Sequence, residues 1–205
     1  MRRLAFLAPR LDRPAADAAP PSEPIPLPPD CNFLQLLAHS PAVIEAYRAY
    51  DRALAQGQLT PKQREMIALT VAEINGSKYG LSAHYATAKA VGLSEEEIRL
   101  ARKATGLDPL QAAMLRFTRA VALQRGDVSD ADFRSLRDAG FDDAQVTEIV
   151  ANIALNIFTN YFNSVAQTEI GFPVLRPGAD APETATAPPL EPQRPLAYQP
   201  SVSAF

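Results

Sequence analysis

Four positions between residues 73 and 84 carry the residue types most relevant to chemistry in this sequence. Glu73 and His84 are a carboxylate and an imidazole, side chains that commonly transfer protons in enzymes. Ser77 and Gly80 lie between them, in the stretch Asn-Gly-Ser-Lys-Tyr-Gly-Leu-Ser-Ala-His. Glu73 and His84 are therefore candidates for a proton relay. On the residues alone we favour the structural alternative, in which His84 is a partly buried histidine and Glu73 only packs or hydrogen-bonds.

Ser77 could act as a nucleophile only with a base such as His84 within hydrogen-bonding distance. Seven residues of helix span about 10.5 Å, well beyond the ~3 Å that such a pair needs. We therefore predict that Ser77 caps a helix that begins at residue 78, after the stop signal Asn75-Gly76. Gly80 then lies in the first turn of this helix, four residues before His84 and on the same face.

The elements around these positions are predicted to be helices, because capping signals and apolar periodicity recur through the middle of the chain. Ser40-Pro41, Thr60-Pro61 and Asp108-Pro109 each place a capping residue before a proline at the first helical position. No segment alternates apolar and polar residues as a half-buried strand would, so the predicted fold class is all-α. The predicted helices span 41–56, 61–75, 78–91, 95–105, 109–125, 130–139 and 143–169.

The two ends of the chain differ from its middle in composition. Of nineteen prolines, only Pro61 and Pro109 lie between residues 60 and 172. We therefore expect a single helical domain at 31–175, between a Pro/Ala-rich arm at 1–30 and a Pro-rich tail at 176–205. Cys31 is the one cysteine of the chain and stands where arm and domain meet. We expect it to be a linker thiol without a role.

Charge and hydropathy exclude several classes of function. A net charge of −3 and the lack of a basic stripe argue against nucleic-acid binding. No apolar run approaches the ~20 residues of a membrane span, and the apolar run near the N-terminus is too short for a signal peptide, so we expect a cytoplasmic protein. Two histidines 45 residues apart and one distant cysteine make no convincing metal site, and no phosphate loop is visible. We therefore expect no metal and no cofactor.

The last predicted helix contains a stripe of asparagines, Asn152, Asn156, Asn160 and Asn163. Buried amides need hydrogen-bond partners, so this stripe either lines a pocket or mediates contacts between helices or subunits. We favour the second interpretation. The same helix is about 40 Å long and apolar around much of its circumference, which predicts that a partner subunit covers part of it.

The residues described above resemble those of the alkylhydroperoxidase D and carboxymuconolactone decarboxylase-like proteins, in particular the peroxidase-related branch. The family signature is Glu-x3-Cys-x2-Cys-x3-His. Glu73 and His84 match its outer members, whereas Ser77 and Gly80 stand at the two cysteine positions. Three flanking segments extend the likeness over about residues 35 to 175: LTPKQREMIALTVAEING, AVGLSEEEI and IALNIFTNYFNSVAQTEIGFP.

The resemblance implies an alkylhydroperoxidase D-like helical fold that works as a homo-oligomer, a trimer or a hexamer. For cysteine-bearing members it also implies peroxide reduction, in which the second thiol attacks while the glutamate and the histidine relay protons. A serine hydroxyl cannot replace a thiolate and glycine has no nucleophile, so we expect thiol peroxidase activity to be lost.

Two functional hypotheses follow from this resemblance and from the replacement of the two cysteines. In the first, His84 and Glu73 retain acid–base chemistry on a small molecule bound near His84, as the lactone decarboxylase branch suggests. In the second, the protein is a catalytically inactive oligomeric binding or interaction module. An open, polar cavity beside His84 would favour the first hypothesis, and a closed one the second.

Overall fold

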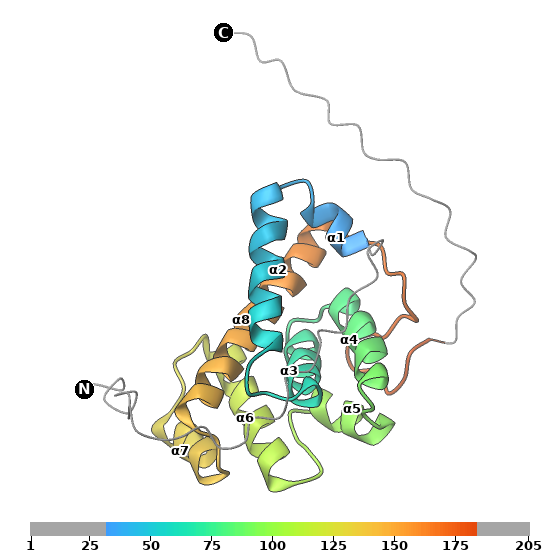
Figure 1. Cartoon of the computed structure of the whole chain (residues 1–205). Coiled ribbons are helices and arrows are strands. Elements are labelled where there is room, and N and C mark those ends of the chain that lie inside the picture. The colour runs from blue at the N-terminus through green and yellow to red at the C-terminus, as the bar shows by residue number, and fades with distance from the viewer. Residues whose placement is uncertain (1–31, 184–205) are drawn as a thin grey trace, which may run out of the picture.

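The computed structural model describes residues 32–183, and within that range it contains eight helices and no strand (Figure 1). The all-α prediction is therefore confirmed. The helices are α1 (Asn32–Leu37), α2 (Pro41–Ala55), α3 (Pro61–Ile74), α4 (Lys78–Ala90), α5 (Glu95–Arg102), α6 (Pro109–Gln124), α7 (Asp130–Asp138) and α8 (Asp143–Ala166).

The starts of α2 to α8 coincide with the predicted starts, because capping side chains define them. Ser77 Oγ accepts a hydrogen bond from the Gly80 backbone N–H at 3.1 Å, so Ser77 is the N-cap of α4. The predicted ends are less accurate. Helix α8 ends at Ala166 rather than at residue 169. The next residue, Gln167, adopts a left-handed conformation with φ of 50° and ends the helix.

Helix α3 is the centre of the fold. Every residue from Met66 to Ala72 is buried, and the helix packs against α4, α5, α6 and α8. A three-residue turn, Asn75–Ser77, joins α3 to α4, and the two helices lie side by side (Figure 1). Any side chain of α3 that reaches a cavity must therefore point between these neighbours.

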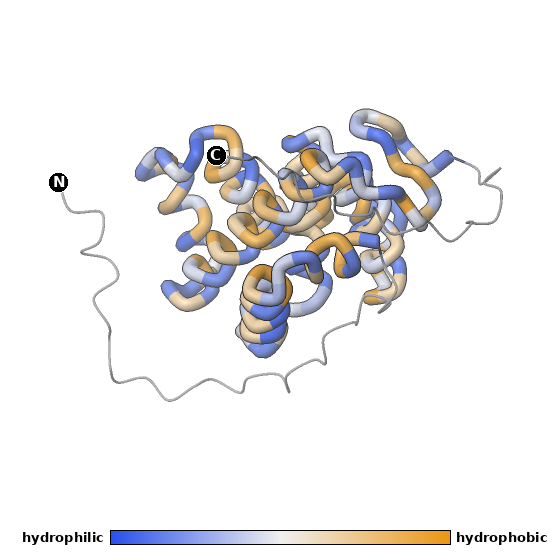
Figure 2. Tube along the Cα trace, turned by 90° about the horizontal axis from the view of Figure 1, so that it is seen from above, coloured by the Kyte–Doolittle hydropathy of each residue, from blue (hydrophilic) through white to orange (hydrophobic). Residues whose placement is uncertain are grey.

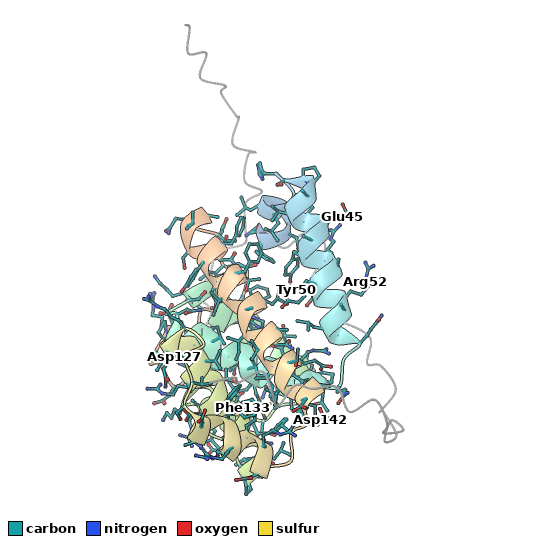
Figure 3. All side chains as sticks on the ribbon, turned by 90° about the vertical axis from the view of Figure 1, so that its left-hand side faces the viewer. Glu45, Tyr50, Arg52, Asp127, Phe133 and Asp142 are labelled. Atoms are coloured by element: carbon teal, nitrogen blue, oxygen red, sulfur yellow. The ribbon has the colours of Figure 1, made fainter. Side chains whose placement is uncertain are left out.

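Helix α2 is the outermost long element. It packs against α8 and α1, and only Leu54 and Ala55 at its end are buried. The Tyr50 hydroxyl donates to the Ala151 carbonyl of α8 at 3.0 Å. Figure 3 shows Tyr50 on the side of α2 that faces α8 and Arg52 on the opposite side. Few buried side chains, the Tyr50 hydrogen bond and two hydrogen bonds from Arg64 to the Leu54 and Ala55 carbonyls thus hold α2 over the space in front of α3, α4 and α8.

Hydrophobic residues form two clusters. The larger one surrounds α3, and the smaller one joins α1 to the start of α4 through Phe33 and Tyr79. Figure 2 shows hydrophobic and hydrophilic residues alternating along the helices, as in elements with one buried and one exposed side. Within residues 32–183 no helix combines the length and the apolar character needed to cross a bilayer. The cytoplasmic location stays a prediction.

Residues 176–183, which the sequence assigned to the tail, contact the helical body. The Arg102 guanidinium donates to the carbonyls of Arg176 and Ala179, and the Gly178 N–H donates to Glu73 Oε1 at 2.7 Å. Contacts with the helical body therefore continue past residue 175, and the domain boundaries stay a prediction. The arm, the rest of the tail and Cys31 lie outside the described residues.

Candidate functional site

A cavity of about 100 Å³ opens between α2, α3, α4 and α8. A water molecule needs roughly 10–15 Å³ measured in this way, so the cavity has room for several waters or for one small organic molecule. Its polar lining includes Asp51 from α2, Glu65 from α3, His84 from α4, and Asn156 and Asn163 from α8, and Phe33 from α1 is among its apolar side chains. The wall therefore combines polar and apolar side chains from five helices.

His84 forms a hydrogen-bonded pair with Glu65. His84 Nδ1 lies 2.9 Å from Glu65 Oε2, and the two side chains are 25% and 15% exposed. Burial lowers the pKa of His84, but the charge of Glu65 and hydrogen bonds to Glu65 and Asn156 outweigh it, so the pKa lies above its usual range. Asp51, which lines the cavity from α2, also raises the pKa of His84 through its charge. The site therefore favours a protonated imidazole.

The structure does not bring Glu73 and His84 together, as the predicted relay requires. Glu73 Oε2 accepts from Arg102 Nε at 2.8 Å, and its other oxygen accepts from the Gly178 N–H, so both oxygens are engaged outside the cavity. The short turn between α3 and α4 explains the difference. His84 lies about two helical turns into α4, so its neighbours on α3 lie at a similar distance before the α3–α4 connection. Glu73 lies next to that connection and is too far along α3 to reach His84.

Sequence reasoning therefore missed Glu65. This residue precedes Glu73 by eight positions, roughly 12 Å along the axis of α3. A signal for it existed, because two helices joined by three residues must pair positions at similar distances from their turn. Applying that register to His84 would have pointed to the second turn of α3, where Glu65 lies.

The two positions that correspond to the family cysteines hold no nucleophile. Ser77 is 3% exposed and caps α4. At Gly80 a Cβ atom would lie 2.3 Å from Asn160 Oδ1 and 3.0 Å from Ser77 Oγ. Asn160 is 1% exposed, and neither of its amide atoms has a hydrogen-bond partner. The Asn160 side chain thus takes up the space that a side chain at position 80 would need.

The asparagine stripe divides between two environments. Asn152, Asn156 and Asn163 line the cavity, whereas Asn160 does not line it and faces Gly80. The pocket-lining interpretation, which we disfavoured on the sequence alone, therefore holds for three of the four residues. All four are buried.

The chemistry available in the cavity is that of acids and bases. Its lining, taken over the residues that the structure describes, includes no sulfur-bearing side chain. In the same part of the chain no three His, Cys, Asp or Glu side chains gather in a way that could hold a metal ion. The pair of His84 and Glu65 supplies a proton donor and a carboxylate that orients it.

A family model matches part of the chain. Residues 41–106, which run from the start of α2 to just beyond α5, match the carboxymuconolactone decarboxylase family. This segment includes Glu65, Gly80 and His84 but not the asparagines of α8. Among curated proteins, none is similar to this chain in sequence.

Several solved structures share the fold. A peroxidase-related protein from Silicibacter sp. is 26% identical, with a TM-score of 0.62 over 66% of this chain and 74% of that one. An alkylhydroperoxidase D core protein from Ralstonia eutropha is 29% identical, with a TM-score of 0.60 over 74% and 82%. The debrominase Bmp8, at 18% identity and a TM-score of 0.62 over 68% and 77%, is similar in fold alone.

Proposed function

This chain belongs to the carboxymuconolactone decarboxylase and alkylhydroperoxidase D-like family, and we propose on that premise that it performs acid–base chemistry on a small molecule without a thiol pair. The observation that carries the proposal is the hydrogen bond between His84 and Glu65 on the wall of an open cavity with both polar and apolar side chains in its lining. Serine and glycine at the two cysteine positions remove the thiol route.

In this proposal each member of the pair has a defined task. The raised pKa of His84 favours the protonated imidazole, which donates a proton to the bound molecule as general acid. Once neutral, it accepts a proton as general base. Glu65 accepts the Nδ1 hydrogen, which orients the ring and stabilises its charged form. Glu73, held by Arg102, takes no part.

Proton exchange at carbon tests this assignment. We expect the protein to accelerate deuterium uptake at the carbon beside the carbonyl of small keto acids or lactones, followed by NMR. A positioned acid–base group contributes roughly 10²- to 10⁴-fold, so His84→Gln should lose at least about 100-fold. Glu65→Gln should lose about tenfold, and Glu73→Gln, the matched control on the same helix, should keep the rate. Equal rates in His84→Gln and wild type would refute the proposal.

Peroxide reduction is the activity that we propose has been lost. Purified protein should not reduce alkyl hydroperoxides with a dithiol as reductant. Any slow background reduction should be no faster than that by a free thiol, and it should persist in Cys31→Ser. Turnover close to that of a cysteine-bearing family member, unaffected by Cys31→Ser, would overturn this part of the proposal.

A second candidate function, an inactive oligomeric module, has one observation in its favour. Helix α8 leaves a row of apolar side chains exposed in the single chain: Val150 (42%), Phe158 (40%), Tyr161 (59%) and Val165 (85%). Exposed apolar rows of this kind are typical of interfaces. We propose that a homo-oligomer, a trimer or a hexamer, covers this row. The oligomer is compatible with both candidate functions.

Light scattering at micromolar concentration tests the oligomer. We expect a multiple of 22.2 kDa, and a shift toward that monomer mass in the double variant Tyr161→Glu/Val165→Glu. Glu45→Arg, on the exposed side of α2, serves as a control for a charge change elsewhere on the surface. A monomer mass for the wild type would refute the proposed assembly.

A further inference from the structure

A second cavity, of about 70 Å³, lies beside the first. Four residues line both cavities: Asp51 from α2, Arg64 and Glu65 from α3, and Thr87 from α4. At roughly 10–15 Å³ for each water molecule, the second cavity has room for a small polar group and its hydration. The two cavities thus meet at these four side chains, and a molecule bound beside His84 has all of them on its wall.

Asp51 is a carboxylate without a direct partner where the cavities meet. The residue is exposed, and the described residues act on it through burial and through charges at a distance, not through a hydrogen bond. Desolvation by the surrounding atoms raises the pKa of its carboxyl, and the charge of Arg64 offsets this only in part. A carboxylate that has lost part of its water in this way gains from a cation that binds beside it.

Two further acceptors on the wall of the first cavity have capacity left. Glu65 pairs with His84 through Oε2, at 2.9 Å, and Asn152, which is 4% exposed, donates from Nδ2 to the Glu148 carbonyl at 2.8 Å. Glu65 Oε1 and Asn152 Oδ1 accept no hydrogen bond from the described residues, and neither is among the unpaired atoms that are closed off from solvent. Both oxygens can therefore accept from a bound molecule.

The cations on the walls are turned toward other groups of the protein. His84 Nδ1 pairs with Glu65, and Arg64 Nη1 donates to two carbonyls at the end of α2, at 3.3 and 3.0 Å. The end of a helix carries a partial negative charge, so the Arg64 charge is largely spent on α2. Of the charged side chains that line the two cavities, Asp51 is thus the one without a direct partner among the described residues.

Aromatic side chains supply an apolar part of the first cavity. Phe33, Tyr47 and Tyr79 line it, and the rings of Phe33 and Tyr47 meet edge to face with centroids 5.1 Å apart. Aromatic rings pack well against a flat apolar ligand body, and their faces attract a nearby cation. The volume of about 100 Å³ restricts that body to a small ring.

We propose that the first cavity binds a small primary amine with a ring as its body, and that Asp51 holds the ammonium group where the two cavities meet. The inference rests on the proposed function, because it names the class of molecule on which His84 and Glu65 act. The ring lies among the aromatic side chains, and Glu65 Oε1 and Asn152 Oδ1 are the further acceptors on the wall. Asp51 is in this account a specificity-determining residue.

The bound ammonium changes the charge beside His84. The charge of Asp51 is one of the causes that raise the pKa of His84, and a cation at Asp51 cancels that charge. The pKa of His84 should therefore fall when the amine binds. The amine in this way favours the neutral imidazole, which accepts a proton from the bound molecule.

Benzylamine and benzyl alcohol test the inference, because they share a ring and a methylene group and differ in the charge of the head. Binding to the full chain at neutral pH would be followed by ligand-observed NMR at millimolar concentration. We expect benzylamine to bind at least about tenfold more tightly, because only its head forms a charge-assisted hydrogen bond. Asp51→Asn should weaken benzylamine binding about tenfold and leave benzyl alcohol unchanged. Glu45→Gln, which removes an exposed carboxylate of α2 outside both cavities, should change neither.

NMR of the His84 ring locates the bound head. Benzylamine should lower the pKa of His84 in the wild type but not in Asp51→Asn, and benzyl alcohol should leave it unchanged. The ring signals of His39, an exposed residue outside both cavities, serve as an internal reference.

The outcomes separate this inference from the proposed function. Equal affinities of the two compounds for the wild type, tighter binding of benzyl alcohol, or binding of neither would overturn the inference, and this ratio decides even if Asp51→Asn does not fold. Benzylamine binding that Asp51→Asn leaves unchanged would overturn the role of Asp51. The exchange assay with His84→Gln judges the proposed function independently. Exchange that depends on His84 together with equal affinities would leave the acid–base proposal standing and remove only the amine.

Discussion

Helix α3 carries two carboxylates that form ion pairs with opposite characters. Glu65 pairs with His84 on the wall of an open cavity, and Glu73 pairs with Arg102, whose side chain is only 6% exposed. Histidine gains and loses its proton near neutral pH, whereas arginine stays charged. The first pair can therefore change its charge during a reaction, and the second cannot.

The residues around the two pairs also make the first pair accessible to a ligand and the second pair structural. The Arg102 guanidinium donates to the Arg176 and Ala179 carbonyls as well as to Glu73, so it fastens the segment after α8 to the core. The imidazole of His84 has a carboxylate and an amide beside it and a cavity in front of it. The partner and its access to a ligand, not the presence of a carboxylate, therefore decide which pair is structural.

Arg102→Met should have the largest effect on stability, because it removes the structural ion pair with Glu73. Removing one partner of a buried ion pair commonly costs about 3–5 kcal/mol, and we expect about 3 kcal/mol of unfolding free energy here because Glu73 is 21% exposed. Urea denaturation measures it. Arg99→Met, which removes an exposed ion pair from the same helix, should cost less than about 1 kcal/mol. Equal losses in the two variants would contradict the structural role of Arg102.

Gly80 lies in the first turn of α4, where Asn160 restricts the space available to a side chain. Alanine is usually preferred to glycine in a helix by about 1 kcal/mol. Here the added Cβ would lie 2.3 Å from Asn160 Oδ1, so we expect Gly80→Ala to cost about 2 kcal/mol in thermal or urea unfolding.

Two further variants control for the cause of that loss. Gly80→Ala/Asn160→Ala should be more stable than the sum of the single changes predicts, because the second substitution removes the collision. Lys78→Ala, exposed in the same turn, should change stability by less than about 0.5 kcal/mol. If the effects of Gly80→Ala and Asn160→Ala were strictly additive, Asn160 would not restrict position 80.

Glu65→Gln should change the protonation of His84. We expect the pKa of His84, followed by NMR of its ring, to fall, because the charge and the hydrogen bond of Glu65 are main causes that raise it. Glu73→Gln should leave this pKa unchanged. A fall with Glu73→Gln and none with Glu65→Gln would reverse our assignment of the two carboxylates.

The raised pKa of His84 also predicts how stability depends on pH. A folded-state pKa above the unfolded value of about 6.5 means that the folded protein binds the proton more tightly. The resulting stabilisation is fully present below that value and is lost as the pH rises through the folded pKa. The difference in unfolding free energy between wild type and His84→Gln should therefore be larger at acidic than at alkaline pH, as urea denaturation at several pH values would measure.

Local sequence signals were sufficient for the helices and for part of the site. Capping residues such as Ser77 satisfy backbone N–H groups within three residues, so they define helix starts without reference to the rest of the chain. The same local logic assigned Ser77 to a cap rather than to a nucleophile, and it placed Gly80 and His84 on one face of α4. Helix ends were less accurate, because no side chain marked the left-handed residue Gln167 that ends α8.

The sequence by itself determined that the chain is helical, that positions 77 and 80 lack thiols, and that His84 is the candidate acid or base. Only the tertiary structure decided which carboxylate serves His84. Glu65 and Glu73 are the same residue type on the same helix, and the register between α3 and α4 sends one to the cavity and the other to Arg102. The short turn between α3 and α4 restricts the partner of His84 to about one turn of α3, and only the packing of the two helices selects the residue within it.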